Sequence, residues 1–508
     1  NTGYIKCRLA WHRKLARFFV ASYRVEQKTF QSSALYVPSS VSNKQRNDMK
    51  LRAIIIITFL SIGFTSYSQK RLFSKEEAIQ DIDTMQKYIE EIHPNAYAYK
   101  SKEVINNLYE RVKSEITDSI SIYELYNYAS FITANYGDGH LSTIFPNSWN
   151  RENHLVVPFM IEISNQKVYV KKIIDGNGIF ENAEVIKING VSINEIIDTM
   201  LVSRSGEALH FKKEMVKYYF PNLLYSIYGF ENKYEVEFNQ NDTINTLVLN
   251  GVLYKDYLKM LNGDDNNTID FSAKYFNEKK ICLIDFREFS DLERFKTFLD
   301  TVFNNIKRDS INNLIIDLRN NSGGNSALGD ELFQYISKTD FTQYDKTILK
   351  VSSHLKSLWT SYYLPQGIID SITVNELLKL PNGIIVRTDT VFNDDEEIVK
   401  LNEISNRFYG NIYVLTSNFT FSSAADFAWC FKHYNMGKII GEEAGGWGLC
   451  FGDNVYAELP NSRLAINVSC KLFYNIGATE TSTHGVIPDF QVKPEDALDY
   501  VIKIIEKK

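Results

Sequence analysis

Three short segments of this sequence carry residue types that could do chemistry. The first is Asp317-Leu-Arg-Asn-Asn-Ser-Gly-Gly324, whose paired glycines let backbone N–H groups turn outward, as stabilisation of an oxyanion requires. The second is Thr420-Phe-Ser-Ser-Ala-Ala-Asp-Phe427, which opens a predicted helix whose dipole favours negative charge beside a serine. The third is Gly137-Asp-Gly-His140, a loop whose histidine suits a general base near neutral pH. Together the three segments contain the parts of a serine-nucleophile site.

Each segment also has a plainer structural explanation. A glycine pair serves an ordinary turn between a strand and a helix, and Ser423 with Asp426 has the spacing of a helix capping box. A lone histidine in a loop, such as His140, usually has no catalytic role. A phosphate loop is excluded because the GxxxxGK[ST] spacing is absent. The five cysteines form no CxxC pair, which argues against a zinc ribbon or a thioredoxin-type site. Their spacing leaves open whether Cys430, Cys450 and Cys470 form disulfides.

The composition is that of a large globular protein. The chain has 508 residues, of which 44% are hydrophobic, so it can bury a sizeable core over several domains. Its 62 acidic and 56 basic residues give a net charge of −6. This acidic balance argues against a nucleic-acid binder, which usually carries a basic domain or stripe.

The N-terminal region has the pattern of an export signal. Met49-Lys-Leu-Arg52 is basic, residues 53–64 are apolar, and small residues follow at Ser66 and Ser68. This pattern predicts a secretory signal peptide at 49–68, too short to span a membrane, so we expect a periplasmic or extracellular mature chain without a stable membrane span. Residues 1–48 precede an initiator-like Met and are expected to be a non-native upstream extension.

The segment 69–150 is expected to form an N-terminal helical bundle. Apolar residues recur at spacings of three and four from Ala78 to Ile92, which indicates an amphipathic helix. Ser74 and Glu77 precede that helix with the spacing of a capping box. Similar patterns predict further helices at about 102–116 and 121–134.

The segment 151–255 is expected to form a β-rich domain. Hydrophobicity alternates with a period of two at 156–163, 167–172 and 234–238. Residues 183–196 predict a strand, a tight Asn189-Gly190 turn, a second strand and a helix. That order resembles the inner part of a PDZ domain, which binds peptides by strand addition, although an ordinary β-rich domain remains the alternative.

The segment 256–508 alternates strands and helices. Apolar runs at 279–286, 313–318 and 412–416 predict buried strands, and helical patterns separate or follow them. Strands that alternate with helices indicate an α/β fold with a largely parallel sheet covered on both faces.

The order of the motifs resembles one peptidase family. After the two motifs at 317–324 and 420–427 come Ile439-Ile-Gly-Glu442 and Gly485-Val-Ile-Pro-Asp489. Over about 270–495 the chain resembles the C-terminal-processing, or tail-specific, serine peptidases, and more closely their tricorn-like and retinoid-binding-protein-like branch. The resemblance implies a Clp-protease/crotonase-like α/β core and an exported serine peptidase that acts on peptides or proteins and needs no metal or organic cofactor.

The resemblance also assigns roles to single residues. Ser423 matches the nucleophile, which would form an acyl-enzyme, and Ala424 matches one backbone donor of the oxyanion hole. Gly323 or Gly324 matches the other backbone donor. His140 matches the general base of the tricorn-like branch.

The supporting carboxylate and the choice of base carry alternatives. Glu480 is the candidate for the distal carboxylate on the histidine side, and His484 is a rival to His140 as the base. A polysaccharide hydrolase would need a carboxylate pair, which the sequence does not place.

Two departures from the family pattern leave a second function open. Residues 445–450 hold no lysine where the processing peptidases have the lysine of a Ser–Lys dyad, and Gly139 stands where the tricorn pattern has a serine. The alternative function is a catalytically inactive protein that binds peptides or apolar ligands on the same fold. Neither alternative fixes an oligomeric state.

Overall fold

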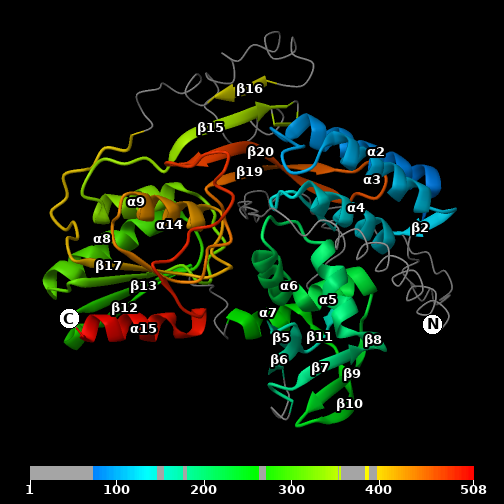
Figure 1. The fold of residues 1–508 in the computed structure, drawn as a ribbon, viewed down its shortest axis with the longest axis horizontal. Helices are drawn as coiled ribbons and strands as arrows, with labels where there is room; N and C mark the ends of the chain where they lie inside the picture. Colours follow the sequence, from blue (N-terminus) through cyan, green and yellow to red (C-terminus); the bar gives the residue numbers. More distant parts are fainter. Residues whose placement is uncertain are drawn as a thin grey trace, which may run out of the picture.

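The computed structural model describes residues 72–145, 154–174, 180–262, 270–352, 354–355, 384–387 and 398–507 (Figure 1). The expected upstream extension at 1–48 and the expected signal peptide at 49–68 lie outside these residues. Within the described ranges, no helix combines the length and the apolar character that crossing a membrane requires.

The chain begins with three helices and a short strand pair. These elements are β1 (Leu72–Ser74), α2 (Lys75–Ile92), α3 (Lys102–Glu115), β2 (Ser119–Ser121) and α4 (Ile122–Tyr136). The predicted capping box is confirmed, because the side chains of Ser74 and Glu77 each accept a hydrogen bond from the other residue's backbone N–H. The helices share one hydrophobic core with residues of the C-terminal strands, including Val455 and Ile466. They therefore pack directly on the C-terminal region.

The next region is an antiparallel sheet with two helices on it. The strand order is β10-β9-β7-β6-β5, and β8 pairs with β7. The strands are β5 (Phe159–Ser164), β6 (Lys167–Ile173), β7 (Glu184–Ile188), β8 (Val191–Ser192), β9 (Lys233–Gln240) and β10 (Thr243–Asn250). The helices are α5 (Ile193–Val202) and α6 (Leu209–Leu223), which continues into the π-helical turn η3 (Leu224–Tyr228). The predicted tight turn is confirmed at Asn189 and Gly190, where both residues have positive φ.

A short strand pair and a helix follow this sheet. Strand β4 (Leu155–Val156) pairs with β11 (Val252–Leu253), and α7 (Tyr254–Asn262) begins directly after β11.

The C-terminal region contains the predicted α/β sheet. Its order is β12-β13-β14-β17-β18-β21, with β12 antiparallel to β13 and the other neighbours parallel. The strands are β12 (Phe271–Phe276), β13 (Ile281–Phe286), β14 (Asn313–Asp317), β17 (Asn411–Thr416), β18 (Lys438–Gly441) and β21 (Phe490–Gln491). Helices α8 (Leu292–Arg308), α9 (Ala327–Ile336) and α14 (Ser423–His433) cover one face, and α15 (Pro494–Glu506) covers the other (Figure 1).

A second sheet of the C-terminal region joins the two ends of the chain. Its order is β16-β15-β20-β19, with β3 on the side of β20. The strands are β3 (Ser142–Ile144), β15 (Tyr344–Val351), β16 (Ile384–Arg387), β19 (Leu449–Glu458) and β20 (Ala465–Asn475). Strand β3 directly follows the Gly137–His140 loop, and its residues pair with 465–467 of β20. This pairing carries the N-terminal loop to the C-terminal half of the molecule.

Candidate active site

The turn between β17 and α14 holds Ser422 in an unusual backbone conformation. Ser422 is the N-cap of α14, with φ 47° and ψ −133°, a region that costs a non-glycine residue about 1–3 kcal/mol. The turn is fixed from the side of β14, because Phe421 N–H donates to the carbonyl of Asn321 and the Thr420 hydroxyl donates to the carbonyl of Leu318. The surrounding contacts thus hold Ser422 in a backbone conformation that a serine rarely adopts.

His140 faces this serine from the other end of the chain. Its Nε2 lies 3.3 Å from Oγ of Ser422, and its ring centroid lies 5.8 Å from that of Phe421. Gly137, with φ 87°, ends α4 in the left-handed conformation, and the backbone N–H of His140 donates to Oδ1 of Asp138. The glycine and the aspartate therefore shape the loop that presents the imidazole.

The environment of His140 favours the neutral ring. Burial lowers the pKa of His140 below its ordinary value, while Asp138, the backbone of Phe451 and Asp453 act in the opposite direction. Nδ1 is buried and has no side-chain partner among the described residues, and the backbone of Phe451 is the hydrogen-bonding group that faces the ring. A Cβ on Gly452 would lie 3.5 Å from Nδ1, so this nitrogen faces the backbone of β19. A neutral imidazole with Nε2 toward Ser422 is arranged to accept a proton.

The glycine pair after β14 lies against the same turn. Gly323 has φ 101°, and a Cβ there would come within 2.5 Å of Cβ of Ser422 and 2.9 Å of N of Ser423. Gly324 has φ 138°, and its carbonyl oxygen accepts a 2.7 Å hydrogen bond from the Ser423 hydroxyl. The structure therefore pairs His140 with Ser422, whereas the Ser423 side chain contacts the glycine pair.

Two of the predicted oxyanion donors already have partners. The N–H of Ala424 donates to the carbonyl of Phe421, and the N–H of Gly323 donates to Oδ1 of Asn321. Neither hydrogen is available without breaking a hydrogen bond of the fold.

Two neighbouring N–H groups remain available. Among the described residues, the N–H groups of Ser423 and Gly324 have no hydrogen-bond acceptor. The first belongs to the residue after Ser422, at the N-terminus of α14, where the helix dipole favours negative charge.

The two remaining predicted site residues lie elsewhere. Glu480 is exposed, and its carboxylate accepts a 3.4 Å hydrogen bond from the Tyr474 hydroxyl. His484 is also exposed, with Nδ1 2.7 Å from the carbonyl oxygen of Gly485 and its ring beside Trp429. In the described contacts, neither side chain reaches Ser422 or His140.

Helix α6 supplies an apolar wall next to the serine turn. The ring of Phe211 stacks on that of Phe421 at 4.4 Å, and Ala208 completes this buried cluster. Further along the helix, Tyr218 stacks on Phe419 at 5.5 Å. The region that precedes the α/β sheet in the chain thus contributes directly to the surroundings of Ser422.

Neither disulfides nor grouped metal ligands occur among the residues that the structure describes. Cys282, Cys430, Cys450 and Cys470 are buried free thiols, which answers the question that their spacing left open. Across the part of the chain that the structure describes, no three His, Cys, Asp or Glu side chains are grouped as metal ligands.

Sequence comparison finds one protein family and no curated relative. Residues 280–358 and 365–492 match the model of peptidase family S41. No curated protein sequence matches the chain significantly.

The chain is similar to several solved structures at low sequence identity. Mature CPAF complexed with lactacystin is 12% identical, with a TM-score of 0.59 over 85% of this chain and 99% of that chain. Mature CPAF has the same identity and TM-score, over 85% of this chain and 97% of that chain. The photosystem II D1 C-terminal processing protease is 13% identical, with a TM-score of 0.43 over 84% of this chain and 97% of that one.

The family match and the observed fold agree. The matched residues include the glycine pair, the serine turn and the strands and helices that hold them, and the mixed α/β structure is that of CPAF. Residues 280–358 and 365–492 therefore match peptidase family S41, and the predicted resemblance to the tail-specific and tricorn-like serine peptidases is confirmed.

Proposed function

We propose that this protein is a serine peptidase that cleaves peptide bonds through an acyl-enzyme on Ser422, with His140 as the general base. One observation carries the proposal: a strained serine at a helix N-terminus lies with its Oγ 3.3 Å from a buried imidazole Nε2. An unassisted serine hydroxyl is a poor nucleophile, and a neutral imidazole at this distance supplies the missing base.

The nucleophile proposed from geometry is one residue before the one that the sequence motif suggests. Ser423 donates its hydroxyl hydrogen to Gly324, so its oxygen is held against the glycine pair. Ser422 is half-buried, and its hydroxyl is the one beside the base. Ser423 is accordingly assigned a supporting role.

The proposed oxyanion hole consists of the backbone N–H groups of Ser423 and Gly324. The assignment is supported by their open N–H groups and by the close approach of Gly323 to the Ser422–Ser423 peptide. Ala424 and Gly323 are set aside as donors because the fold already uses their hydrogens. Preorganised donors of this kind are worth about 10²–10³-fold each in rate.

The reaction needs only these groups. Oγ of Ser422 forms a bond to the substrate carbonyl carbon while its proton moves to Nε2 of His140, and the carbonyl oxygen takes the negative charge. The C–N bond then breaks as His140 returns that proton to the leaving amine. Water, activated by the same imidazole, hydrolyses the ester and regenerates Ser422. A dyad lysine has no step to perform in this sequence.

The substrate and the location of the protein follow from other observations. The family match supports peptide or protein substrates, and the apolar wall of Phe211 and Phe421 supports an apolar residue near the cleaved bond. Export rests on the signal-peptide pattern at 49–68. The alternative of an inactive binding protein loses its main argument, because His140 stands where a base is needed even though the dyad lysine is missing.

A fluorophosphonate probe tests this proposal. The purified protein is labelled at pH 7.5, digested, and the modified peptide is fragmented by mass spectrometry to locate the adduct. We expect the adduct on Ser422, no labelling of Ser422→Ala, and persistent labelling of Ser423→Ala. An adduct on Ser423, or a folded wild-type protein that does not react, would overturn the assignment.

A further inference from the structure

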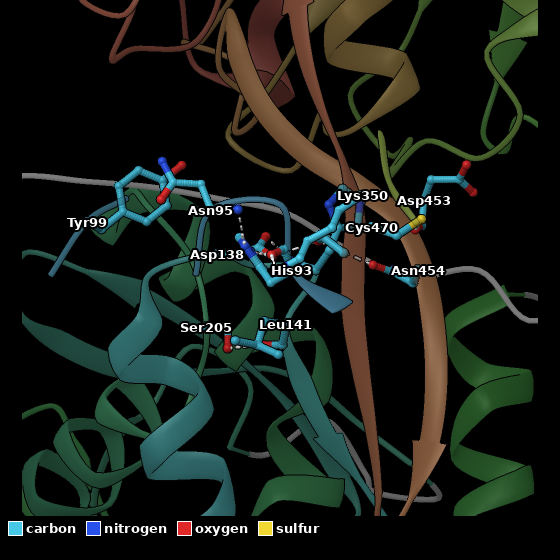
Figure 2. Close-up of polar contacts among 12 residues, drawn as sticks. His93, Asn95, Tyr99, Asp138, Leu141, Ser205, Lys350, Asp453, Asn454 and Cys470 are labelled. Carbon is cyan, nitrogen blue, oxygen red and sulfur yellow. Dashed lines mark hydrogen bonds and ion pairs between the residues drawn. The ribbon is translucent and has the colours of Figure 1, made fainter. Parts of the chain in front are cut away.

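A buried carboxylate, Asp138, lies in a polar network with His93 (Figure 2). The side chain of Asp138 is 1% exposed. Its Oδ1 accepts the backbone N–H of His140 at 2.8 Å, and its Oδ2 accepts the hydroxyl hydrogen of Ser469 at 2.6 Å. The same Oδ2 lies 3.1 Å from Nε2 of His93, which comes from the end of α2.

The contacts of His93 fix where its ring hydrogen lies. Nδ1 of His93 accepts the backbone N–H of Asn95 at 3.1 Å, so Nδ1 carries no hydrogen. The hydrogen is therefore on Nε2 and points to Asp138. Asp138 thus accepts hydrogen bonds from three donors, the arrangement that stabilises a carboxylate in its ionised form.

Burial favours the neutral forms of three other titratable groups around Asp138. Tyr99, Glu207 and Cys450 all feel the Asp138 charge, and burial is the main cause that raises the pKa of each. The Tyr99 hydroxyl donates to Glu207, and this bond lies within the same buried cluster. Asp138 is the member of this set that accepts hydrogen bonds from three donors, the His140 N–H, Ser469 and His93.

The network is anchored by elements from both ends of the chain. Lys350 on β15 donates from Nζ to the carbonyls of Glu90 and His93 at the end of α2. Ser469 comes from β20, and the ring of His93 packs at 4.5 Å on that of Phe451 in β19. Figure 2 shows His93, Asp138 and Lys350 together at this junction. Three strands and a helix therefore determine where Asp138 stands.

We infer that His93, Asp138 and Ser469 form a positioning triad for the peptidase reaction, in which the Asp138 anion orients the His140 loop and stabilises the imidazolium formed when Ser422 loses its proton. The inference rests on the proposed function. The carboxylate acts on His140 through its backbone N–H and through space, since no hydrogen bond joins it to the imidazole ring in the part of the chain that the structure describes. Asp138 and its two partners are positioning residues and do not contact the substrate.

The charge at Asp138 is tested by a matched pair of substitutions. Asp138→Asn keeps the shape of the side chain but removes the buried anion. Asp453→Asn removes a carboxylate that also acts on His140, but one that is half exposed and paired with Lys471. Water screens the charge of Asp453 much more than that of Asp138.

The readout is the pH dependence of fluorophosphonate labelling and of peptide hydrolysis. We expect Asp138→Asn to lower kcat by about 10–100-fold with KM within about twofold, and to move the acidic limb of the rate profile to lower pH, because a lost anion favours the neutral base. Asp453→Asn should move the limb much less. A folded Asp138→Asn protein with the wild-type rate and profile would overturn the inference.

Substitutions at His93 provide an independent arm if Asp138→Asn does not fold. The side-chain amide of His93→Gln can replace the Nε2–H donor, whereas His93→Phe keeps the ring and removes the donor. We expect His93→Gln to retain most of kcat and His93→Phe to lose about tenfold, with circular dichroism showing that both are folded. Equal rates for the two variants would contradict the positioning role. A wild-type protein that is not labelled at all would instead reject the proposed function.

Discussion

The Ser423 hydroxyl donates a 2.7 Å hydrogen bond to the carbonyl oxygen of Gly324. This bond joins the first turn of α14 to the glycine pair that follows β14, and it fixes the peptide whose N–H we assign to the oxyanion hole. The two adjacent serines therefore make different contacts. Ser423 holds the backbone in place, and Ser422 lies beside His140.

Substitution of the two serines should separate these roles. Ser422→Ala removes the nucleophile and should reduce peptide hydrolysis by about 10⁴-fold or more. Ser423→Ala removes one neutral hydrogen bond worth about 1 kcal/mol, so its rate should fall by about tenfold or less. Steady-state kinetics on one fluorogenic peptide compares the two variants. A larger loss from Ser423→Ala would return the nucleophile to position 423.

The activity should persist at mildly acidic pH. A general base works in its neutral form, and burial lowers the pKa of His140 below its ordinary value of 6.5. The kcat/KM profile should therefore rise with pH to a midpoint below 6.5 and stay level through neutral pH. A midpoint above 6.5 would show that the Asp138 and Asp453 charges outweigh burial.

The two histidines that the sequence offered as bases should differ sharply. His140→Gln should lower kcat by about 10²–10⁴-fold, since it removes the acceptor of the Ser422 proton. His484→Gln is the matched control, because His484 is exposed and lies beside Trp429. Its kcat should stay within about twofold of the wild type. A strong effect of His484→Gln would reopen the choice of base.

A methyl group at Gly323 should damage the site more than the fold. Gly323→Ala would place Cβ 2.5 Å from Cβ of Ser422 at a φ of 101°, so the serine turn must move. We expect about a 100-fold loss of kcat, because small displacements of reacting groups have large effects on rate. Gly190→Ala is the control: it has φ 77° but no atom within 4 Å of the new Cβ. It should reduce the melting temperature slightly and leave kcat unchanged.

Asp426 should make the stability of the protein depend on pH in a recognisable way. Burial raises its pKa from 3.8 to about 6, although Asn475 and Tyr344 donate to its carboxylate. A raised folded-state pKa favours the folded state most below pH 3.8, and this contribution is lost as pH rises through about 6.

The comparison of Asp426→Asn with the wild type isolates this contribution. The free energy of unfolding of Asp426→Asn, minus that of the wild type, should increase by up to about 3 kcal/mol from pH 4 to pH 7. Urea denaturation at the two pH values measures it. Equal differences at both values would show that Asp426 titrates normally.

Much of the fold could be predicted because its signals are local. The periodicity and capping box of α2, the Asn189-Gly190 turn, and the apolar runs of β13, β14 and β17 depend on neighbouring residues. The position of His140 followed from a short loop motif. These signals require no knowledge of distant parts of the chain.

The details of the site depend on distant contacts. The positive φ of Ser422 is imposed by the segment around Asn321 and Gly323, so a sequence pattern with two serines could not show which one faces the base. Side chains such as that of Asn321 also determine which backbone N–H groups are left without an acceptor. The motif order assigned the supporting carboxylate to Glu480, whose side chain lies beside Tyr474, whereas the carboxylate that contacts the backbone of His140 is Asp138.

The network around Asp138 also depends on contacts that local sequence patterns cannot predict. Asp138 belongs to the loop motif that the sequence offered, but its partners His93 and Ser469 lie 45 and 331 residues away. No periodic pattern connects residues at such separations. A search of the sequence for acidic residues within two positions of the histidine would have found Asp138, but not its role.

The pairing of β3 with β20 has a consequence for the timing of assembly. Ser422 and His140 are 282 residues apart, and the loop of His140 is fixed by residues 465–467, which follow the serine in the chain. A growing chain that has exposed Ser422 but not β20 has a serine without its base. Under the proposed function, the Ser422–His140 pair can form only after β20 has been made, so a chain that ends before residue 465 should show no peptidase activity.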